Sequence, residues 1–94
     1  MTIPQLSGEA RPGLAPGGRL AFDKARDRWV VLAPERVLVP DETALEILQR
    51  CNGTTQVDAI VDELATAYSA DRSEIEHDVK DLLASLIEKR IVTA

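Results

Sequence analysis

The side chains best suited to chemistry in this 94-residue chain are its single histidine, His77, and its single cysteine, Cys51. A zinc site needs several histidine or cysteine ligands at short spacings, and neither residue has such a partner. Cys51 also has no histidine or asparagine that the sequence identifies as activating a nucleophilic thiol. Helical periodicity places His77 on a polar face and Cys51 on an inner face. We therefore expect a surface imidazole, a buried structural thiol, no metal site and no catalytic residue.

The acidic residues and the glycines do not form a catalytic arrangement either. Carboxylates in residues 58–63 and 74–81 are spread around helix faces, and no two of them are paired in a cleft. The sequence Pro16-Gly17-Gly18 does not lie between a strand and a helix, as a glycine-rich phosphate loop does. We therefore expect that the chain is not an enzyme and needs no cofactor.

Length and composition predict one folded domain with an N-terminal tail. An apolar content of 45% is enough for one modest core. Residues 1–18 hold three of the five prolines and four of the five glycines, which predicts a flexible tail or linker before a domain over residues 19–94. No run of residues has the length of a membrane span, and the N-terminus lacks the pattern of a secretory signal. The single cysteine fits a reducing cytoplasm.

Two strands are predicted at the start of this domain. Residues 19–23 and 28–32 are expected to form a hairpin around a four-residue polar turn. Phe22 and Trp29 lie in these strands, and we expect both aromatic rings in the core.

A third strand is predicted at residues 36–39. It is short and apolar, and it lies between Pro34 and Pro40. Proline is tolerated at strand ends and on edge strands but not in a central strand. We therefore place the third strand at an edge of the sheet.

Three amphipathic helices are predicted next. The first begins at the N-cap Asp41 and stops at residues 52–53. The second is expected to be capped by Thr55, and the third begins with a capping box formed by Ser73 and Glu76. The apolar stripes expected to face the core are Ala44, Ile47, Leu48 and Cys51; Val57, Ile60, Val61, Leu64 and Tyr68; and Ile75, Val79, Leu82, Leu83, Leu86 and Ile87, with Ile91 and Val92 packing back after the last helix.

This order of elements predicts an α+β domain in which a three-stranded antiparallel sheet is followed by a three-helix bundle. The first two helices can form a helix-turn-helix, so that the whole resembles a winged helix. A winged helix suggests two kinds of ligand, a nucleic acid or another polypeptide.

DNA binding is the alternative that charge disfavours. The recognition helix would span residues 56–68, which carry three carboxylates and no lysine or arginine. Residues 41–94 hold five basic and twelve acidic residues, a balance of −7, whereas residues 1–40 hold six and four, a balance of +2. Because affinity for DNA comes largely from cations that neutralise phosphates, we expect no nucleic-acid partner.

Peptide capture by strand addition is the competing interpretation. An edge strand presents unpaired backbone groups that a second extended chain can complete. In the strand at residues 36–39, Arg36 is the only charged residue that would discourage pairing with another chain. The shortness of the strand and its flanking prolines can also prevent such pairing. From the residues alone, both interpretations stay open.

The sequence from Glu35 to Val92, preceded by two strands, closely resembles the PqqD family of pyrroloquinoline quinone (PQQ) biosynthesis. The resemblance covers about residues 19–92 and depends on the order and spacing of several short motifs rather than on one diagnostic motif. These motifs are Leu38-Val39-Pro40, Cys51-Asn52-Gly53-Thr54, Val57 with Ile60 and Tyr68, and Ser73-Glu74-Ile75-Glu76 with Asp78-Val79.

The resemblance implies a peptide chaperone. PqqD-like domains are recognition elements for ribosomally made, modified peptides. In this family the domain is expected to bind the precursor peptide PqqA by strand addition and to present it to the radical S-adenosylmethionine enzyme PqqE. Some members are fused to the oxidase PqqC, and residues 13–18 would then serve as a linker.

The resemblance also implies a binding site between the third strand and the third helix. The strand would contribute backbone groups, and the helix would contribute the apolar wall of a groove. Arg36 and Lys80 are candidates to meet acidic residues of the precursor, although both are also ordinary surface charges. The implied peptide-binding residues are Arg36, Val37, Leu38, Val39, Val79, Lys80, Leu83 and Ile87.

Overall fold

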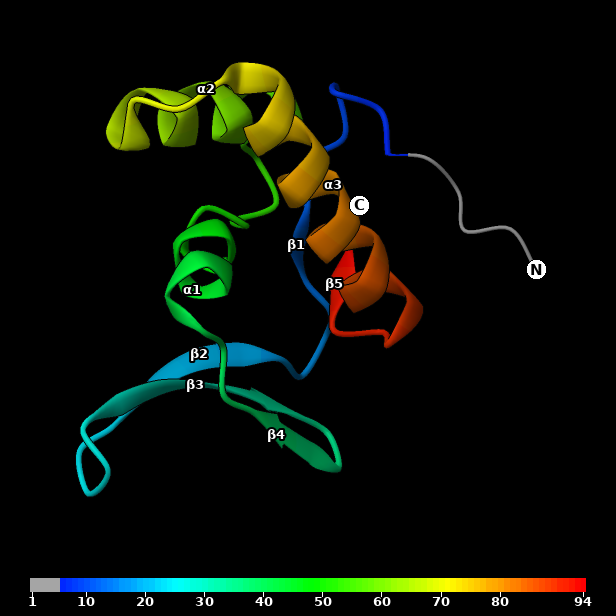
Figure 1. The fold of residues 1–94 in the computed structure, drawn as a ribbon. Helices are drawn as coiled ribbons and strands as arrows, with labels where there is room; N and C mark the ends of the chain where they lie inside the picture. The colour runs from blue at the N-terminus through cyan, green and yellow to red at the C-terminus, as the bar shows by residue number, and fades with distance from the viewer. Residues whose placement is uncertain (1–5) are drawn as a thin grey trace.

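The structure is a computed structural model that describes residues 6–94. Within these residues the elements are β1 (Gly13–Leu14), β2 (Arg19–Asp23), β3 (Arg28–Ala33), β4 (Arg36–Leu38), α1 (Glu42–Gln49), α2 (Val57–Tyr68), α3 (Arg72–Glu88) and β5 (Val92–Thr93). Figure 1 shows the three helices on one side of the sheet made by β2, β3 and β4, with α1 nearest to it. The predicted α+β fold, with a three-stranded antiparallel sheet and three helices, is confirmed.

The three-stranded sheet has the order β2-β3-β4 and is antiparallel throughout. The turn between β2 and β3 is stabilised by Asp23, whose carboxylate accepts hydrogen bonds from the backbone N–H groups of Ala25 and Arg26. The turn between β3 and β4 has Pro34 and Glu35 at its centre, and Glu35 has a φ of 65°. Proline pre-sets the first of these two positions, so the chain reverses within two residues.

The start of α1 agrees with the sequence-based prediction, but the starts of α2 and α3 do not. Asp41 caps α1 by accepting a 2.7 Å hydrogen bond from the N–H of Ala44. The prediction that Ser73 caps α3 is wrong, because Asp71 is the N-cap and accepts a 2.8 Å bond from the N–H of Ser73. The prediction that Thr55 caps α2 is also wrong, because Gln56 occupies the N-cap position without a side-chain bond.

The first turn of α2 is capped by a distant part of the chain. The N–H groups of Val57 and Asp58 donate to the backbone oxygens of Ala10 and Gly8, over 2.8 and 2.9 Å. The orphan donors of a helix N-terminus need such acceptors, and here the N-terminal segment supplies them. The segment, defined here as residues 6–15, therefore contributes to the start of a helix more than forty residues later in the chain.

The N-terminal segment is packed against the domain in the structure. Its Leu14 and Gly13 form β1, which pairs with β5, and Pro12 is buried. A side chain at Gly8 would overlap the Asp58 carboxylate, so this glycine permits close approach. The folded part of the described chain thus extends N-terminal to the boundary predicted near residue 19. Residues 1–5 of the predicted tail lie outside the described residues.

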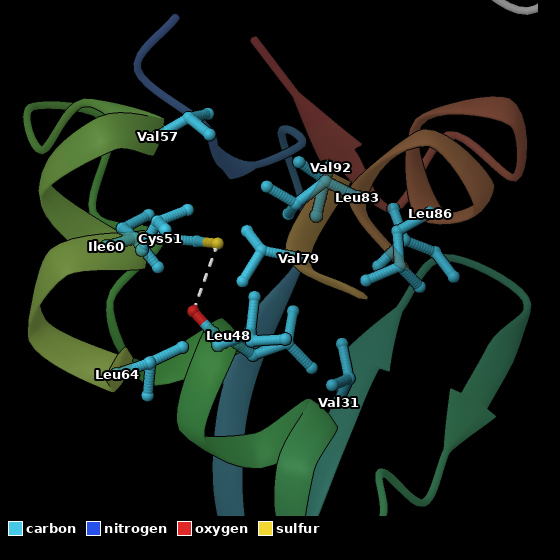
Figure 2. Close-up of a cluster of buried hydrophobic side chains, with 13 residues drawn as sticks. Val31, Leu48, Cys51, Val57, Ile60, Leu64, Val79, Leu83, Leu86 and Val92 are labelled. Carbon is cyan, nitrogen blue, oxygen red and sulfur yellow. Dashed lines mark hydrogen bonds between the residues drawn. The ribbon is translucent and has the colours of Figure 1, made fainter. Parts of the chain in front are cut away.

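The core lies between the helices, β3 and β5 (Figure 2). The Cys51 thiol is buried there and donates to the backbone oxygen of Ile47 over 3.3 Å. Ile91 and Val92 are buried as predicted, and pairing with β1 makes Val92 part of a second, two-stranded sheet. The buried residues of the cluster are Val31, Ile47, Leu48, Cys51, Val57, Ile60, Val61, Leu64, Val79, Leu83, Leu86, Ile91 and Val92.

Three aromatic residues lie outside this core. Phe22 and Trp29 are 44% and 37% exposed, so the prediction that they are core residues is wrong. Tyr68, predicted on the inner face of α2, is also exposed. The β2–β3 hairpin carries the first two rings toward its turn, and Figure 1 shows that this turn extends away from α2 and α3.

Candidate functional site

Strand β4 has an open edge. It pairs with β3 on one side, and no other described strand pairs with it on the other. Val37 is 61% exposed, and Val39, directly after the strand, is 52% exposed. The prediction that this strand lies at the edge of the sheet is confirmed.

The register of the hairpin indicates which backbone groups face outward. Ala33 pairs with Arg36 across the two-residue turn, and the pairs Leu32–Val37 and Val31–Leu38 follow. The pair that closes such a turn is hydrogen-bonded, and bonded and non-bonded pairs alternate along an antiparallel ladder. The backbone groups of Val37 are therefore expected to point away from β3, toward the open edge.

The side chains around this edge alternate between the two faces of the sheet. Leu38 is partly buried and packs against the core, on the face that the helices cover. Val37 and Val39 belong to the opposite face, which accounts for their exposure. A peptide strand added beside β4 would therefore meet apolar side chains of β4 on both faces of the sheet.

Two of the predicted groove residues belong to the core instead. Val79 and Leu83 are 1% and 0% exposed, and Figure 2 shows both among the buried side chains. Their assignment to the wall of a surface groove is not compatible with this burial. The apolar stripe of α3 is wide, and these two residues lie at its centre, where contact with the sheet and the other helices is closest.

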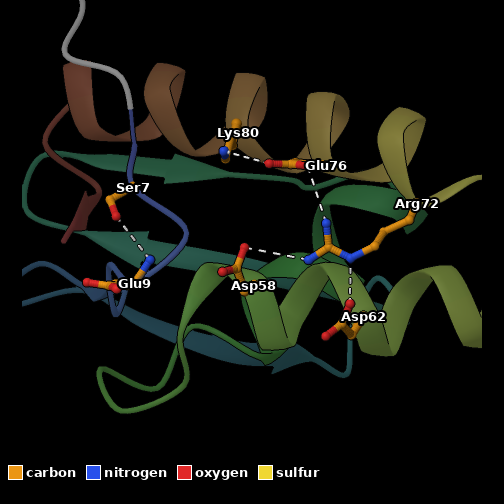
Figure 3. Close-up of polar contacts among 7 residues, drawn as sticks. All are labelled: Ser7, Glu9, Asp58, Asp62, Arg72, Glu76 and Lys80. Atoms are coloured by element: carbon orange, nitrogen blue, oxygen red, sulfur yellow. Dashed lines mark hydrogen bonds and ion pairs between the residues drawn. The ribbon is translucent and has the colours of Figure 1, made fainter.

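Lys80 lies on the side of α3 that faces α2 (Figure 3). Its Nζ donates to Glu76 over 2.7 Å. Arg72 continues the same row, with contacts of 3.3 Å to Glu76 and 2.6 Å to Asp62 of α2. The hydrogen bond from Lys80 and the nearby positive charges lower the pKa of Glu76. The structure thus places Lys80 in an ion-pair row between the helices and does not bring it to the β4 edge.

The remaining predicted residue of the helix, Ile87, is partly buried on the same side of α3 as Lys80. On the opposite side of the buried row lie Ile75 and Leu82, which are also partly buried against the core. These two residues lie on the flank of α3 away from the ion-pair row of Lys80. The apolar pattern predicted the stripe but not its orientation against the core.

The thiol and the possible metal ligands of the described residues are not arranged as a reactive centre or a metal site. Burial raises the pKa of the Cys51 thiol to about 11, so the thiol stays protonated near neutral pH. Among residues 6–94, no three His, Cys, Asp or Glu side chains are grouped so that they could hold a metal ion. In the same residues, no helix combines the length and the apolar character needed to cross a bilayer.

The acidic surface of α2 opposes the nucleic-acid alternative. Asp58, Asp62 and Glu63 are exposed on this helix. The cations in contact with them are already engaged, Arg72 by Asp58 and Asp62 and Arg50 by Glu63. A phosphate backbone would therefore meet a helix surface of net negative charge with no free cation of its own.

These observations define a small winged-helix-like domain in which the apolar strand β4 has an open edge, and the comparisons with known proteins give its family. The family model described as "Coenzyme PQQ synthesis protein D (PqqD)" matches residues 28–92. The chain belongs to the PqqD family.

Relatives and solved structures agree with this family. A "PqqA binding protein" of Rhodopseudomonas palustris strain BisB5 is 52% identical, and the match covers 94% of this chain and 86% of the relative. The solution structure of the PqqD truncation of Methylobacterium extorquens PqqCD, described as a functional and stand-alone recognition element for such modified peptides, is 38% identical with a TM-score of 0.79 and covers 95% of both chains. The crystal structure of PqqD from Xanthomonas campestris is 45% identical, has a TM-score of 0.60, and the match covers 95% of this chain and 99% of that one.

Proposed function

We propose that this chain is a peptide chaperone of PQQ biosynthesis that binds the precursor peptide PqqA at the open edge of β4. The observation that carries the proposal is a free, apolar strand edge on a PqqD-family domain. The relatives named PqqA binding protein support the identity of the ligand.

In this proposal the peptide adds as a strand beside β4. The backbone groups of Val37 set its register, and Arg36, Leu38 and Val39 complete the contact surface. Side chains of α3 that flank the buried row, such as Leu82, offer the apolar wall. Main-chain bonds then supply affinity, and the two faces of the sheet select alternate side chains of the peptide.

The electrostatic part of the proposal concerns the rate of association. Arg36 is exposed at the start of β4 and forms no ion pair with the described side chains, so it can meet acidic residues of the precursor. Complementary charges at the rim of an interface raise the association rate more than the affinity. The ion-paired Lys80 is less suited to this role.

The domain then presents the bound peptide to the radical S-adenosylmethionine enzyme PqqE, in the cytoplasm and without catalysis of its own. Association with PqqC, by fusion or by contact, fits the PqqCD origin of one structural relative. The absence of a catalytic arrangement in residues 6–94 agrees with a role as carrier.

Amide NMR of the labelled protein during titration with PqqA tests this function. We expect the largest shift changes at residues 36–39 and at the flank of α3 that carries Ile75 and Leu82. A peptide of the same composition in scrambled order is the control and should leave these signals in place. Changes confined to residues 56–68 on addition of DNA, with none on addition of PqqA, would replace the proposal by the nucleic-acid alternative.

A further inference from the structure

The β2–β3 hairpin carries an exposed aromatic pair that peptide binding at β4 does not use. Phe22 and Trp29 are directly opposite each other in the register of the hairpin. Their ring centroids are 5.5 Å apart, with an angle of 70° between the ring planes. This edge-to-face contact fixes both rings, yet 44% of Phe22 and 37% of Trp29 stay exposed to solvent.

The pair continues the core face of the sheet beyond the core. Trp29 and Phe22 lie two residues along their strands from Val31 and Leu20, which both contact the core, so the rings point to the same face. Rigid, partly exposed tryptophan and phenylalanine side chains are enriched at protein interfaces, and tryptophan is common among residues that dominate binding energy.

The charge around the pair differs from that of the rest of the molecule. Residues 19–33 carry four basic and two acidic side chains, a balance of +2, whereas residues 41–94 carry −7. Lys24 and Arg26 are exposed in the turn that follows Phe22, although Arg26 also contacts Asp23 over 3.3 Å, whereas Arg28 belongs to the opposite face of the sheet. The complementary surface is therefore apolar at its centre and acidic at its rim.

The position of the pair leaves the β4 edge free. A peptide added to β4 would extend the strand order to β2-β3-β4-peptide, which places it three strands from Phe22 and two from Trp29. At about 4.8 Å between neighbouring strands, the peptide and the rings are separated by roughly 10 to 14 Å. A second protein can thus occupy the hairpin while the peptide occupies the edge.

We propose that the exposed end of the hairpin, formed by Phe22, Trp29 and the turn residues Lys24 and Arg26, docks the enzyme that modifies the carried peptide, through an apolar hollow with an acidic rim on that enzyme. This inference rests on the proposed function, because a peptide carrier needs a surface for the enzyme that is distinct from its peptide site. A nucleic acid fits less well, since the whole chain has a net charge of −5.

The test measures binding of two variants to PqqE and, separately, to PqqA. Phe22→Ala with Trp29→Ala removes the rings, and Lys24→Glu with Arg26→Glu reverses the exposed charges of the turn while keeping the rings. For each variant we expect affinity for PqqE to fall about tenfold or more, as loss of an interface anchor does, and affinity for PqqA to be unchanged. Tyr68→Ala, which removes an exposed ring from the acidic helix α2, is the matched control and should bind PqqE normally.

Each outcome decides between the inference and its alternatives. Normal PqqE affinity in the folded charge-reversal variant, with PqqA still bound, overturns the docking surface and leaves the proposed function standing. Failure of the unaltered protein to bind PqqA overturns the proposed function itself. Self-association or binding of single-stranded DNA that both hairpin variants abolish, without an effect on PqqE, would assign the surface to another partner and overturn the inference.

Discussion

Strands β4 and β5 are both short and each has one paired edge, but the two partners come from different parts of the chain. β5 pairs with β1, which the N-terminal segment supplies from the opposite end of the sequence, whereas β4 pairs with β3 across a two-residue turn. On the other side of β4 there is no described strand. Both strands contain apolar residues, so composition alone does not distinguish them.

The comparison shows that the two short strands are held in place by different means. The pairing of β5 is supported by neighbouring contacts, because Ala15 donates to the oxygen of Ile91 over 2.9 Å and Gly53 donates to the oxygen of Pro12 over 2.9 Å. These bonds connect the segment to the loop between α1 and α2 and to the chain after α3. At the free edge of β4, only the shortness of the strand and the turn of the chain into α1 after Pro40 limit pairing with another strand. An unprotected edge on a small domain is where a partner strand can add.

Removal of the N-terminal segment should produce the largest change, a loss of stability. Deletion of residues 1–15 takes away β1, two capping acceptors of α2 and the buried Pro12. With about 1 kcal/mol for each hydrogen bond and 1.5 kcal/mol or more for each buried apolar side chain, the free energy of unfolding should fall by roughly 4 kcal/mol or more. Urea denaturation measures the change.

Arg11→Ala is the control for this deletion, because it alters an exposed side chain of the same segment and should leave the urea midpoint in place. If the deletion left the free energy of unfolding unchanged, residues 6–15 would behave as the flexible tail that composition predicted, and the contrast between the two strands would disappear.

Substitution of a buried residue of α3 should separate stability from peptide contact. Leu83→Ala leaves a cavity in the core and should lower the free energy of unfolding by about 3 kcal/mol. Asp81→Ala, an exposed change on the same helix, should cost little. Thermal or urea unfolding gives the comparison. A Leu83→Ala protein of normal stability that lost PqqA binding would return this residue to the groove wall.

A proline at the open edge should abolish backbone pairing with the peptide. Val37→Pro removes an N–H that points away from β3, so the hairpin should persist while PqqA affinity falls about tenfold or more, the effect of one to two lost hydrogen bonds and the added steric block. Calorimetric titration with PqqA measures the affinity, and Val37→Ala separates the loss of the side chain from the loss of the N–H. Full affinity in folded Val37→Pro protein would exclude strand addition at this position.

Charge reversal should have the smallest effect. Arg36→Glu at the open edge should slow association with PqqA a few-fold at low salt and little at high salt, because exposed charges are screened. Stopped-flow fluorescence measures the rate. Lys80→Glu is the comparison, since this ammonium group is held by Glu76 on the side facing α2 and should affect the rate less. An equal effect of both variants would mean that Lys80 also faces the peptide.

The sequence predicted the elements well where the local signal is complete. The alternation and flanking prolines of residues 36–39 identified an edge strand, and Asp41 identified the start of α1. The capping prediction for α3 was displaced by two residues, because Asp71 and Ser73 are both good capping residues and the local pattern does not choose between them. The capping prediction for α2 failed because such predictions consider only neighbours along the chain. The true partners of α2 are backbone oxygens of Ala10 and Gly8, which carry no local signal.

The candidate site was predictable only in part. Its strand follows from local pattern, but the assignment of Val79 and Leu83 to a surface depends on the rotation of α3, and rotation is set by packing. Phe22 and Trp29 illustrate the opposite error. Their apolar character predicted burial, whereas the hairpin extends them past the helices that would have covered them.

By itself the sequence determined the α+β order, the edge position of residues 36–39, the acidic character of the helical half and the resemblance to PqqD. These features depend on hydrophobic periodicity and turn-forming residues, which act over a few neighbouring positions, and on net charge, which is a sum over residues. Tertiary structure alone decided that residues 6–15 pack against the domain and pair with β5, and that Val79 and Leu83 lie at the buried centre of the α3 stripe. Both outcomes depend on contacts between residues that are far apart in the sequence. Gly13, for example, permits close approach to the backbone of Gly53, and whether such a glycine loosens a chain or lets it pack depends on what lies next to it in space.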